Sequence, residues 1–251
     1  MVAAGATELP MARGGPGPRL PEWIRVRPPR GSQYGPLREL LAGQQVGTVC
    51  QEARCPNLPE CWSAGTATIM LLGTDCTRRC GFCAVTTRWP RGEVDATEPG
   101  RVAEVVRRSG LRYVVLTQVC RDDLPDGGSE AMAETLGAIR REAPGTRIEL
   151  LIGDLGGSPE SLDRLLRMRP EVLAHNVETV PRRSPQARDR RASYPRSIQL
   201  LERAAHSGEA PPVTKSSIML GLGETEEELL GVFRDLRVAG VRLLTLGQYL
   251  R

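Results

Sequence analysis

The sequence predicts an α/β protein that is built on one parallel sheet. Short apolar runs rich in Val, Ile and Leu alternate with segments of roughly ten to fifteen residues that have helical periodicity. Six such runs occur, and 251 residues are enough for one domain with a substantial core. The pattern shows no switch of strand order, so a partial barrel and a doubly wound sheet both fit it. Both architectures place their chemistry at the carboxyl ends of the strands.

The elements follow from the local pattern along the chain. The expected strands are residues 67–72, 113–116, 147–152, 172–177, 213–220 and 243–246. The expected helices are residues 37–41, 99–108, 129–142, 194–205 and 224–238. A further helix is expected to start at Ser158, with Pro159 in its first turn. Residues 1–21 have proline and glycine punctuation without an apolar core, so we expect a disordered lead-in rather than a secretory signal. Residues 22–66 then form an N-terminal extension, and residues 67–251 form the domain with the sheet.

The composition is that of an ordinary globular protein, with 40% hydrophobic and 25% charged residues. No run of about eighteen apolar residues occurs, so we expect no membrane span. The net charge of +4 and the aromatic content of 4% give no reason to expect nucleic-acid binding.

Seven cysteines are the most informative residues, and six of them lie in one early stretch. In a chain without a secretion signal, such clustering predicts metal or redox chemistry in a reducing cytoplasm. The spacing of Cys76, Cys80 and Cys83 suits a 4Fe–4S cluster with one open iron, to which S-adenosylmethionine could bind. Electron transfer from such a cluster would cleave the sulfonium and give a carbon radical. The alternative is a zinc site with a fourth ligand from elsewhere, although neither His175 nor His206 lies near in sequence.

A second group of cysteines precedes the first one along the chain. Cys50, Cys55 and Cys61 have looser spacing, which in isolation would suit a structural zinc loop. Their place just ahead of the tighter group suggests a second cluster with three local ligands.

The residues around both groups resemble the lipoyl synthases. The match runs from Cys50 to Trp62 (CQEARCPNLPECW) and from Gly73 to Val85 (GTDCTRRCGFCAV). It continues, in order, through residues 115–117, 121–128 (RDDLPDGG), 175–181 (HNVETVP), 218–225 (IMLGLGET) and 244–250 (LTLGQYL). The resemblance covers roughly residues 22–251. It implies an α/β fold with a partial (β/α)6 TIM-type barrel and an N-terminal cysteine-rich, cluster-binding extension.

The resemblance also implies a chemistry for the two cysteine groups. Cys76, Cys80 and Cys83 correspond to the ligands of a radical-generating 4Fe–4S cluster. Cys50, Cys55 and Cys61 correspond to those of an auxiliary 4Fe–4S cluster that is sacrificed as the sulfur source. With S-adenosylmethionine, such an enzyme inserts two sulfur atoms into an octanoyl group amide-linked to a lysine. An acid, a base or a polar nucleophile is not suited to breaking an unactivated C–H bond or to trapping the resulting radical.

The same resemblance implies partners. The octanoyl group is carried by lipoyl carrier domains, those of the glycine cleavage H protein and of the acyltransferase subunits of 2-oxoacid dehydrogenases. A ferredoxin or flavodoxin is the expected electron donor. We expect a cytoplasmic monomer without nucleic-acid or membrane partners.

The loops after the other strands supply the remaining expected cofactor-binding residues, which are Asp122, Asp123, Asn176, Glu178, Gly221 and Glu224. The two aspartates, with Gly127 and Gly128, follow the second strand, where radical enzymes hold the methionyl amine; a plain turn is the alternative. Alternation puts Asn176 and Glu178 on one face, suited to ribose hydroxyls or substrate, and His175 on the other. The loop with Gly221 and Glu224 resembles one that faces adenine or ribose.

Two further features have plain interpretations. Cys120 stands where the family usually has Asp, and we expect a small buried side chain rather than a ligand. Nearly all basic residues are arginines, so the arginine-rich stretch 182–191 is expected to be a solvated face, with docking of an acidic carrier domain as the alternative.

Other protein classes share some of these features. Biotin synthase and the methylthiotransferases also combine such a site with a second cluster. The auxiliary cysteines precede the radical site here, which argues against biotin synthase. No nucleic-acid domain follows the barrel in this sequence, which argues against the tRNA methylthiotransferases. A two-cluster electron carrier would not need six βα units. Family members continue with an Arg-Ser-Ser-Tyr run whose serine binds the auxiliary cluster, whereas this sequence ends at Arg251. Cys120 is therefore a candidate replacement ligand, and an inactive cluster-binding remnant stays open.

Overall fold

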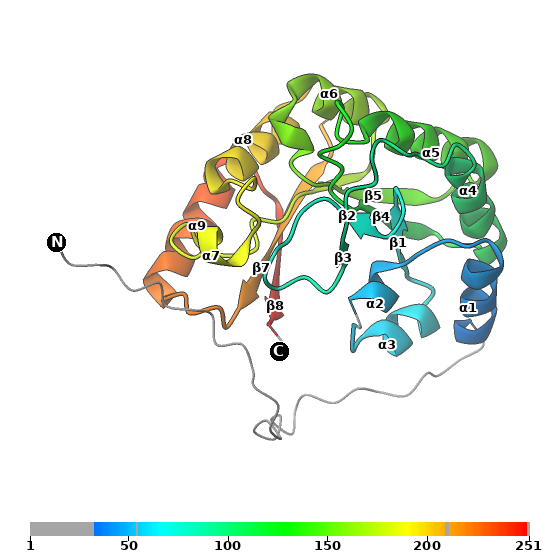
Figure 1. Ribbon diagram of the computed structural model, residues 1–251, viewed down its shortest axis with the longest axis horizontal. Helices are drawn as coiled ribbons and strands as arrows, with labels where there is room; N and C mark the ends of the chain where they lie inside the picture. Colours follow the sequence, from blue (N-terminus) through cyan, green and yellow to red (C-terminus); the bar gives the residue numbers. More distant parts are fainter. Residues whose placement is uncertain (1–32, 54, 209–210, 250–251) are drawn as a thin grey trace.

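The computed structural model describes residues 33–53, 55–208 and 211–249 and contains a six-stranded parallel sheet (Figure 1). Its strands, in their order across the sheet, are β1 (Thr68–Leu71), β4 (Tyr113–Gln118), β5 (Arg147–Leu151), β6 (Val172–Ala174), β7 (Val213–Leu220) and β8 (Leu243–Gln248). This order follows the chain without the switch that a doubly wound sheet requires. Within the described residues β1 and β8 do not pair with each other, so the sheet is a partial, open barrel.

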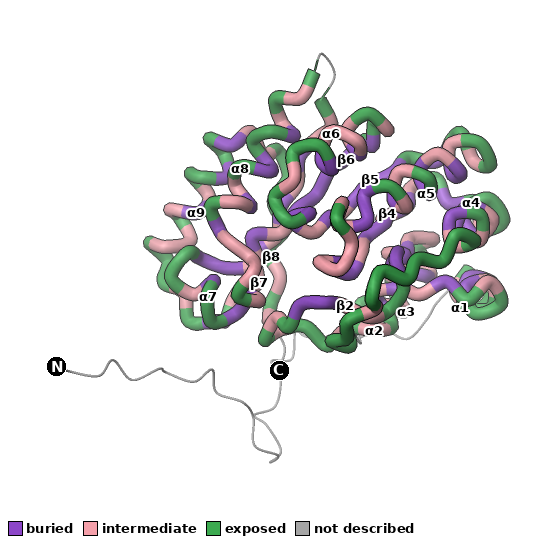
Figure 2. The backbone as a smooth tube through the Cα atoms, turned by 45° about the horizontal axis from the view of Figure 1, so that its top comes forward, coloured by how far each residue is buried: buried purple, intermediate pink, exposed green. Residues whose placement is uncertain are grey.

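Helices cover the outer face of the sheet (Figure 1). Five of them each connect two neighbouring strands, as parallel pairing requires: α4 (Glu98–Ser109), α5 (Ser129–Glu142), α6 (Pro159–Arg167), α8 (Tyr194–Ala205) and α9 (Glu226–Val238). Their apolar faces pack on the strands, and Val102, Leu136 and Leu165 have no exposed surface. Burial of each such side chain stabilises the fold by about 1.5–3 kcal/mol. Figure 2 shows how buried residues follow the strands and the inner sides of the helices.

Local sequence explains where helices begin. Ser158 Oγ accepts a hydrogen bond from the Ser161 N–H, with Pro159 in the first turn of α6, as predicted. Thr225 and Glu228 form a capping box, so the helix predicted from residue 224 begins at Glu226. The segments predicted at 129–142, 194–205 and 213–220 coincide with α5, α8 and β7.

The fourth main strand, β6, is shorter than the predicted 172–177. It ends at Ala174 because the chain leaves the extended conformation soon afterwards. Glu178 has a φ of +69°, and its N–H donates to the carbonyl of Ser217 (3.1 Å). A left-handed residue cannot continue a strand, and this turn carries the side chains after β6 toward the interior of the barrel.

The N-terminal extension contains helices where the sequence predicts mainly a loop. After α1 (Tyr34–Gly43) come α2 (Val49–Glu52) and α3 (Leu58–Ser63). Pro59 lies in the first turn of α3, where a missing N–H breaks no helical bond. The Met70 N–H donates to the carbonyl of Gly47 (2.9 Å), which joins the extension to β1. The predicted lead-in, residues 1–21, lies outside the described residues.

Three short elements complete the functional end of the sheet. β2 (Asp75–Cys76) and β3 (Thr86–Thr87) pair with each other, and α7 (Ser184–Ala187) lies between β6 and α8. None of the helices that the structure describes combines the length and the apolar character needed to cross a membrane.

Candidate functional site

The cysteine loop (residues 76–83) lies at the carboxyl ends of the strands. It connects β2 with β3, and its three thiols, on Cys76, Cys80 and Cys83, line one cavity of about 240 Å³. The wall opposite the loop includes Asn176 and Glu178, which follow β6. The structure therefore brings together the radical-cluster cysteines and two of the predicted cofactor-binding residues.

Hydrogen bonds reach the sulfur atoms of this loop. The Arg78 N–H donates to Cys76 Sγ (3.4 Å), and the Asp189 N–H donates to Cys80 Sγ (3.3 Å). A hydrogen bond from the Cys120 thiol lowers the pKa of Cys76 to about 6. Burial raises the pKa of Cys80 and of Cys83, and neighbouring thiolates raise it further. Metal binding would relieve this repulsion, because a bound metal keeps thiols deprotonated.

The donor set fits an iron–sulfur cluster better than a zinc ion. All three donors are thiols, and two of the sulfur atoms receive backbone N–H bonds of the kind that tune cluster potentials. In the part of the chain that the structure describes, no three His, Cys, Asp or Glu side chains gather closely enough to share one metal ion. Neither cysteine group is thus a preformed compact tetrahedral zinc site.

The second group of thiols lies in the N-terminal extension. Cys50 is buried on α2, Cys61 is half-buried on α3, and Cys55 lies between these helices. Burial raises the pKa of Cys61, and the charges of Cys50 and Cys55 raise it further, so the three thiols are neighbours. Val49, next to Cys50, lines the cavity of the cysteine loop. The extension therefore borders the same cavity.

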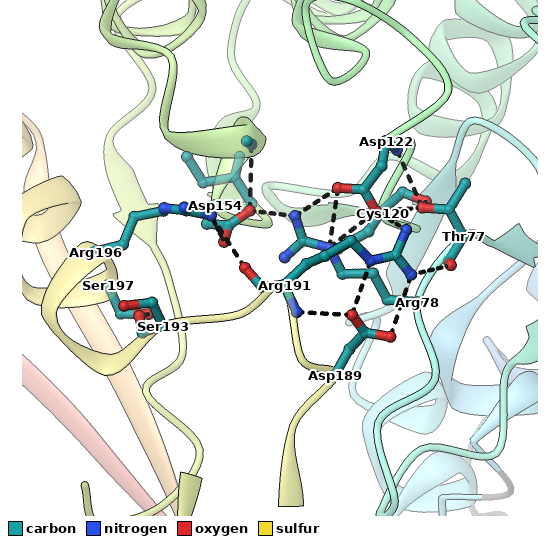
Figure 3. Close-up of polar contacts among 12 residues, drawn as sticks. Thr77, Arg78, Cys120, Asp122, Asp154, Asp189, Arg191, Ser193, Arg196 and Ser197 are labelled. Carbon is teal, nitrogen blue, oxygen red and sulfur yellow. Dashed lines mark hydrogen bonds and ion pairs between the residues drawn. The ribbon is translucent and has the colours of Figure 1, made fainter. Parts of the chain in front are cut away.

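A buried ion network surrounds the start of the cysteine loop (Figure 3). Arg78 donates from Nη2 to Asp122 Oδ1 (2.7 Å) and to Asp154 Oδ1 (2.6 Å), and only 5% of its side chain is exposed. Burial alone would raise the pKa of Asp122, but hydrogen bonds from Arg78 and Thr77 lower it. The predicted cofactor residue Asp122 therefore already binds groups of its own chain.

The neighbouring Asp123 is also engaged. Its carboxylate pairs with Arg121 (2.8 Å between Nε and Oδ1) and accepts the Gly92 N–H (2.7 Å), with both side chains almost fully buried. Gly127 and Gly128 both have positive φ, and a Cβ at Gly128 would meet Leu72 Cδ1. This segment has the plain turn that was the alternative interpretation, and glycine is required there.

The residues after β6 that line the cavity are His175, Asn176 and Glu178. The alternation puts His175 on the other face, but in the structure it borders the same cavity. Burial raises the pKa of Glu178 to about 7. Both ring nitrogens of His175 are already engaged, with Nδ1 2.9 Å from the carbonyl of Ile152 and Nε2 2.8 Å from Ser197 Oγ. Burial lowers its pKa to about 4, so the imidazole is neutral and its hydrogen bonds are satisfied.

The loop after β7 stays outside this cavity. The carboxylate of Glu224 accepts the N–H groups of Gly221 (2.6 Å) and Leu222 (2.8 Å), which closes the turn. Neither Gly221 nor Glu224 is among the residues that line the cavity of the cysteine loop.

Arg188 is a site residue that the sequence interpretation missed. The expectation of a solvated face for 182–191 is wrong at this position, where 8% of the residue is exposed. It lines the cavity, and Nη1 donates to Ser197 Oγ (3.0 Å). Burial lowers its pKa, and no carboxylate of the described residues lies within ion-pair distance. In so arginine-rich a chain nothing in the sequence distinguishes this arginine; the turn at α7 makes it point inward.

Cys120 lies next to the radical-cluster cysteines. Its thiol contacts Cys76, and its carbonyl accepts hydrogen bonds from Thr77 N–H (3.0 Å) and Thr77 Oγ1 (2.9 Å). The end of β4 is thereby joined to the cysteine loop.

Comparison with known proteins agrees with this arrangement. Residues 70–236 match the radical SAM superfamily. The chain is 52% identical to the lipoyl synthase of Thermus thermophilus, over 92% of this chain and 71% of that protein. It is also 52% identical to the lipoyl synthase of Pyrobaculum arsenaticum, over 92% of this chain and 78% of that protein.

Solved structures share the fold. An FeFe-hydrogenase maturase from Carboxydothermus hydrogenoformans superposes with a TM-score of 0.60 at 16% identity, covering 87% of this chain and 58% of that one. Methylornithine synthase superposes with a TM-score of 0.57 at 16% identity, covering 88% and 66%. At such identities the likeness concerns the fold alone.

Proposed function

This chain belongs to the lipoyl synthase family of the radical SAM superfamily, and we propose that it inserts two sulfur atoms into a protein-bound octanoyl-lysine to give lipoyl-lysine. It is then a sulfurtransferase that uses S-adenosylmethionine and two 4Fe–4S clusters. The observation that carries the proposal is a three-cysteine group that lines the cavity of a radical SAM barrel, with a second three-cysteine group in the extension that borders this cavity through Val49.

We assign the clusters by the cysteines that would hold them. Cys76, Cys80 and Cys83 would hold the radical-generating cluster, and Cys50, Cys55 and Cys61 the auxiliary cluster, which in this proposal is the sulfur source. The first cluster supplies the electron that cleaves bound S-adenosylmethionine to a carbon radical. The chain's own residues orient the reactants and exclude water.

Arg188 is the best candidate for the carboxylate of S-adenosylmethionine. A buried guanidinium with one neutral partner is costly unless an anion joins it, and Arg188 lies on the cavity wall with Cys80. We retain Asn176 and Glu178 for the ribose hydroxyls or the substrate, since both line the cavity.

The other predicted cofactor residues have less direct roles. Asp122 and Asp123 hold the cysteine loop and its neighbour through arginines, and we propose that they shape the cofactor pocket. Gly221 and Glu224 form a turn outside this cavity.

An apolar strip suits the octanoyl chain. Val49, Met70 and Val85 line the cavity between the extension and the cysteine loop. An alkyl chain on these side chains would lie beside the cysteine loop and the extension, the two segments that carry the proposed cluster ligands. We propose octanoylated carrier domains, such as the glycine cleavage H protein and 2-oxoacid dehydrogenase acyltransferases, as substrates and a ferredoxin or flavodoxin as reductant. The need for six reduced thiols favours the cytoplasm.

A single-turnover assay on an octanoyl-lysine peptide tests the proposal. The reconstituted chain should form 5′-deoxyadenosine and lipoyl product. Cys80→Ala should abolish both, whereas Cys55→Ala should keep cofactor cleavage and lose sulfur insertion, because the groups serve different steps. Lipoyl product from Cys55→Ala would overturn the assignment of the sulfur donor, and absence of cofactor cleavage in the unmodified chain would favour the inactive remnant.

A further inference from the structure

The connection between α7 and α8 crosses the cysteine loop on the side of the cavity. The Gly81 N–H donates to the carbonyl of Ala187 (2.8 Å). Arg191 Nη2 donates to the carbonyl of Thr77 (2.5 Å). The connection therefore holds the loop on both sides of its middle cysteine.

Asp189 makes the most direct contacts between the connection and the loop. Its backbone N–H donates to Cys80 Sγ (3.3 Å). Its side-chain Oδ2 accepts the N–H of Arg79 (2.9 Å), the residue just before that cysteine. Asp189 thus contacts both the Cys80 thiol and the adjoining peptide, and 9% of its side chain is exposed.

Arg191 fixes the carboxylate of Asp189 in this position (Figure 3). Its Nε lies 2.9 Å from Oδ1, and its backbone N–H also donates to Oδ1 (3.0 Å). Its Nη1 lies 3.3 Å from Asp122 Oδ2, which links the pair to the network around Arg78. These contacts hold the pKa of Asp189 well below its usual range, so the carboxylate stays charged.

The loop has little regular structure of its own to hold it. The paired strands at its ends, β2 and β3, have two residues each. Contacts from outside the loop must therefore keep the three thiols in register. The Asp189 N–H reaches the sulfur of Cys80, and the Cys120 thiol reaches that of Cys76.

We propose that Asp189 is a positioning residue for the radical-generating cluster, its carboxylate fixing the connection so that its own N–H is donated to the Cys80 thiolate. The inference rests on the proposed function, since it assumes a cluster at this loop. Reduction adds negative charge that spreads over the cluster sulfurs, and an N–H donor stabilises that charge. Asp189 therefore raises the reduction potential of the radical-generating cluster and slows its loss.

The test is a redox titration of the reconstituted chain, followed by electron paramagnetic resonance. The signal that changes on addition of S-adenosylmethionine identifies the radical-generating cluster. In Asp189→Ala its midpoint potential should become more negative, and a chelator should remove its iron severalfold faster. Asp189→Asn keeps an oxygen that can accept the Arg79 N–H, so it should recover part of both properties.

Controls separate this role from general stability. Asp163→Ala removes an exposed carboxylate paired with Arg203, and it should change neither potential nor iron loss. Arg191→Ala keeps the Asp189 carboxylate but removes the side chain that fixes it, so it should shift the potential in the same direction by less. If Asp189→Ala does not fold, the midpoint potential of Arg191→Ala still tests the proposed role of Asp189.

The outcomes distinguish the inference from the function on which it rests. Unchanged potentials in Asp189→Ala and Arg191→Ala, with cofactor cleavage intact in the unmodified chain, would overturn the role of Asp189 alone. If the unmodified chain shows no cluster signal that responds to S-adenosylmethionine, the proposed function itself fails.

Discussion

Replacing Arg188 with Met tests the cofactor pocket at a buried arginine that forms no ion pair with the described residues. The side chain is 8% exposed and donates one hydrogen bond, to the neutral Ser197 hydroxyl. Methionine fills a similar volume without charge, so the change removes the cation while leaving the wall of the cavity packed.

The expected magnitude follows from this environment. A hydrogen bond between charged groups contributes about 1.5–3 kcal/mol, which corresponds to a roughly 10- to 150-fold weaker Kd for S-adenosylmethionine. Stability should respond in the opposite sense. A buried cation without a counter-charge costs free energy in the empty pocket, so the Tm of Arg188→Met without cofactor should equal or exceed that of the parent.

Calorimetric titration of S-adenosylmethionine into the reconstituted protein measures the affinity, and thermal unfolding measures stability. Arg182→Met is the matched control, because this arginine of the same stretch is exposed and pairs with Glu228 (2.6 Å); it should leave the Kd unchanged. A Kd for Arg188→Met within twofold of the parent would refute the assignment of Arg188 to the carboxylate.

Three other expectations concern stability and metal content. Burial lowers the pKa of His175 from 6.5 to about 4. At about 1.4 kcal/mol per pKa unit, the neutral side chain contributes about 3 kcal/mol to the free energy of unfolding. This contribution is present above pH 6.5 and is lost as the pH falls toward 4. Urea unfolding at pH 7 and pH 5 should show that the free energy of unfolding depends less on pH in His175→Gln than in the parent. The exposed His206→Gln is the control. The same pH dependence in His175→Gln as in the parent would contradict this expectation. Arg78→Met should lower the free energy of unfolding by about 1.5–3 kcal/mol, because Asp122 and Asp154 each lose one of two arginine partners; a loss no greater than that of the exposed Arg203→Met would argue against it. Iron analysis should find about eight irons per chain and about half in Cys80→Ala, and equal contents would remove Cys80 from the ligands.

The strand and helix pattern could be predicted because periodicity and capping are local. The alternation of apolar runs and amphipathic segments determines a parallel sheet, and Thr225 and Ser158 mark the starts of their helices. The extension was less predictable, because Pro56 and Pro59 suggest a loop around its cysteines. In the structure, Pro59 begins a helix instead.

The candidate cysteine ligands could be identified in the sequence because the spacing of residues within one loop is itself a local property. Their supporting groups were not. Arg78 meets Asp154, 76 residues later, and the Asp189 N–H meets Cys80, 109 residues earlier. A backbone N–H donor is present in nearly every residue type, so the sequence does not mark it. The sequence predicts Asp122 as a cofactor residue because its loop is in the right place, but not that two arginines bind it.

The common cause of these long-range contacts is the parallel sheet. It brings the carboxyl ends of all its strands to one edge, so loops far apart in sequence meet there. A three-thiol loop with two-residue strands at its ends could not hold its geometry in isolation. It is supported by β4 through the Cys120 carbonyl, by β5 through Asp154 and by the α7–α8 connection through Asp189. The proposed site is thus assembled by the whole barrel, and substitutions of Asp154 and Asp189 should affect the cluster more than substitutions of loop residues that are not cysteines.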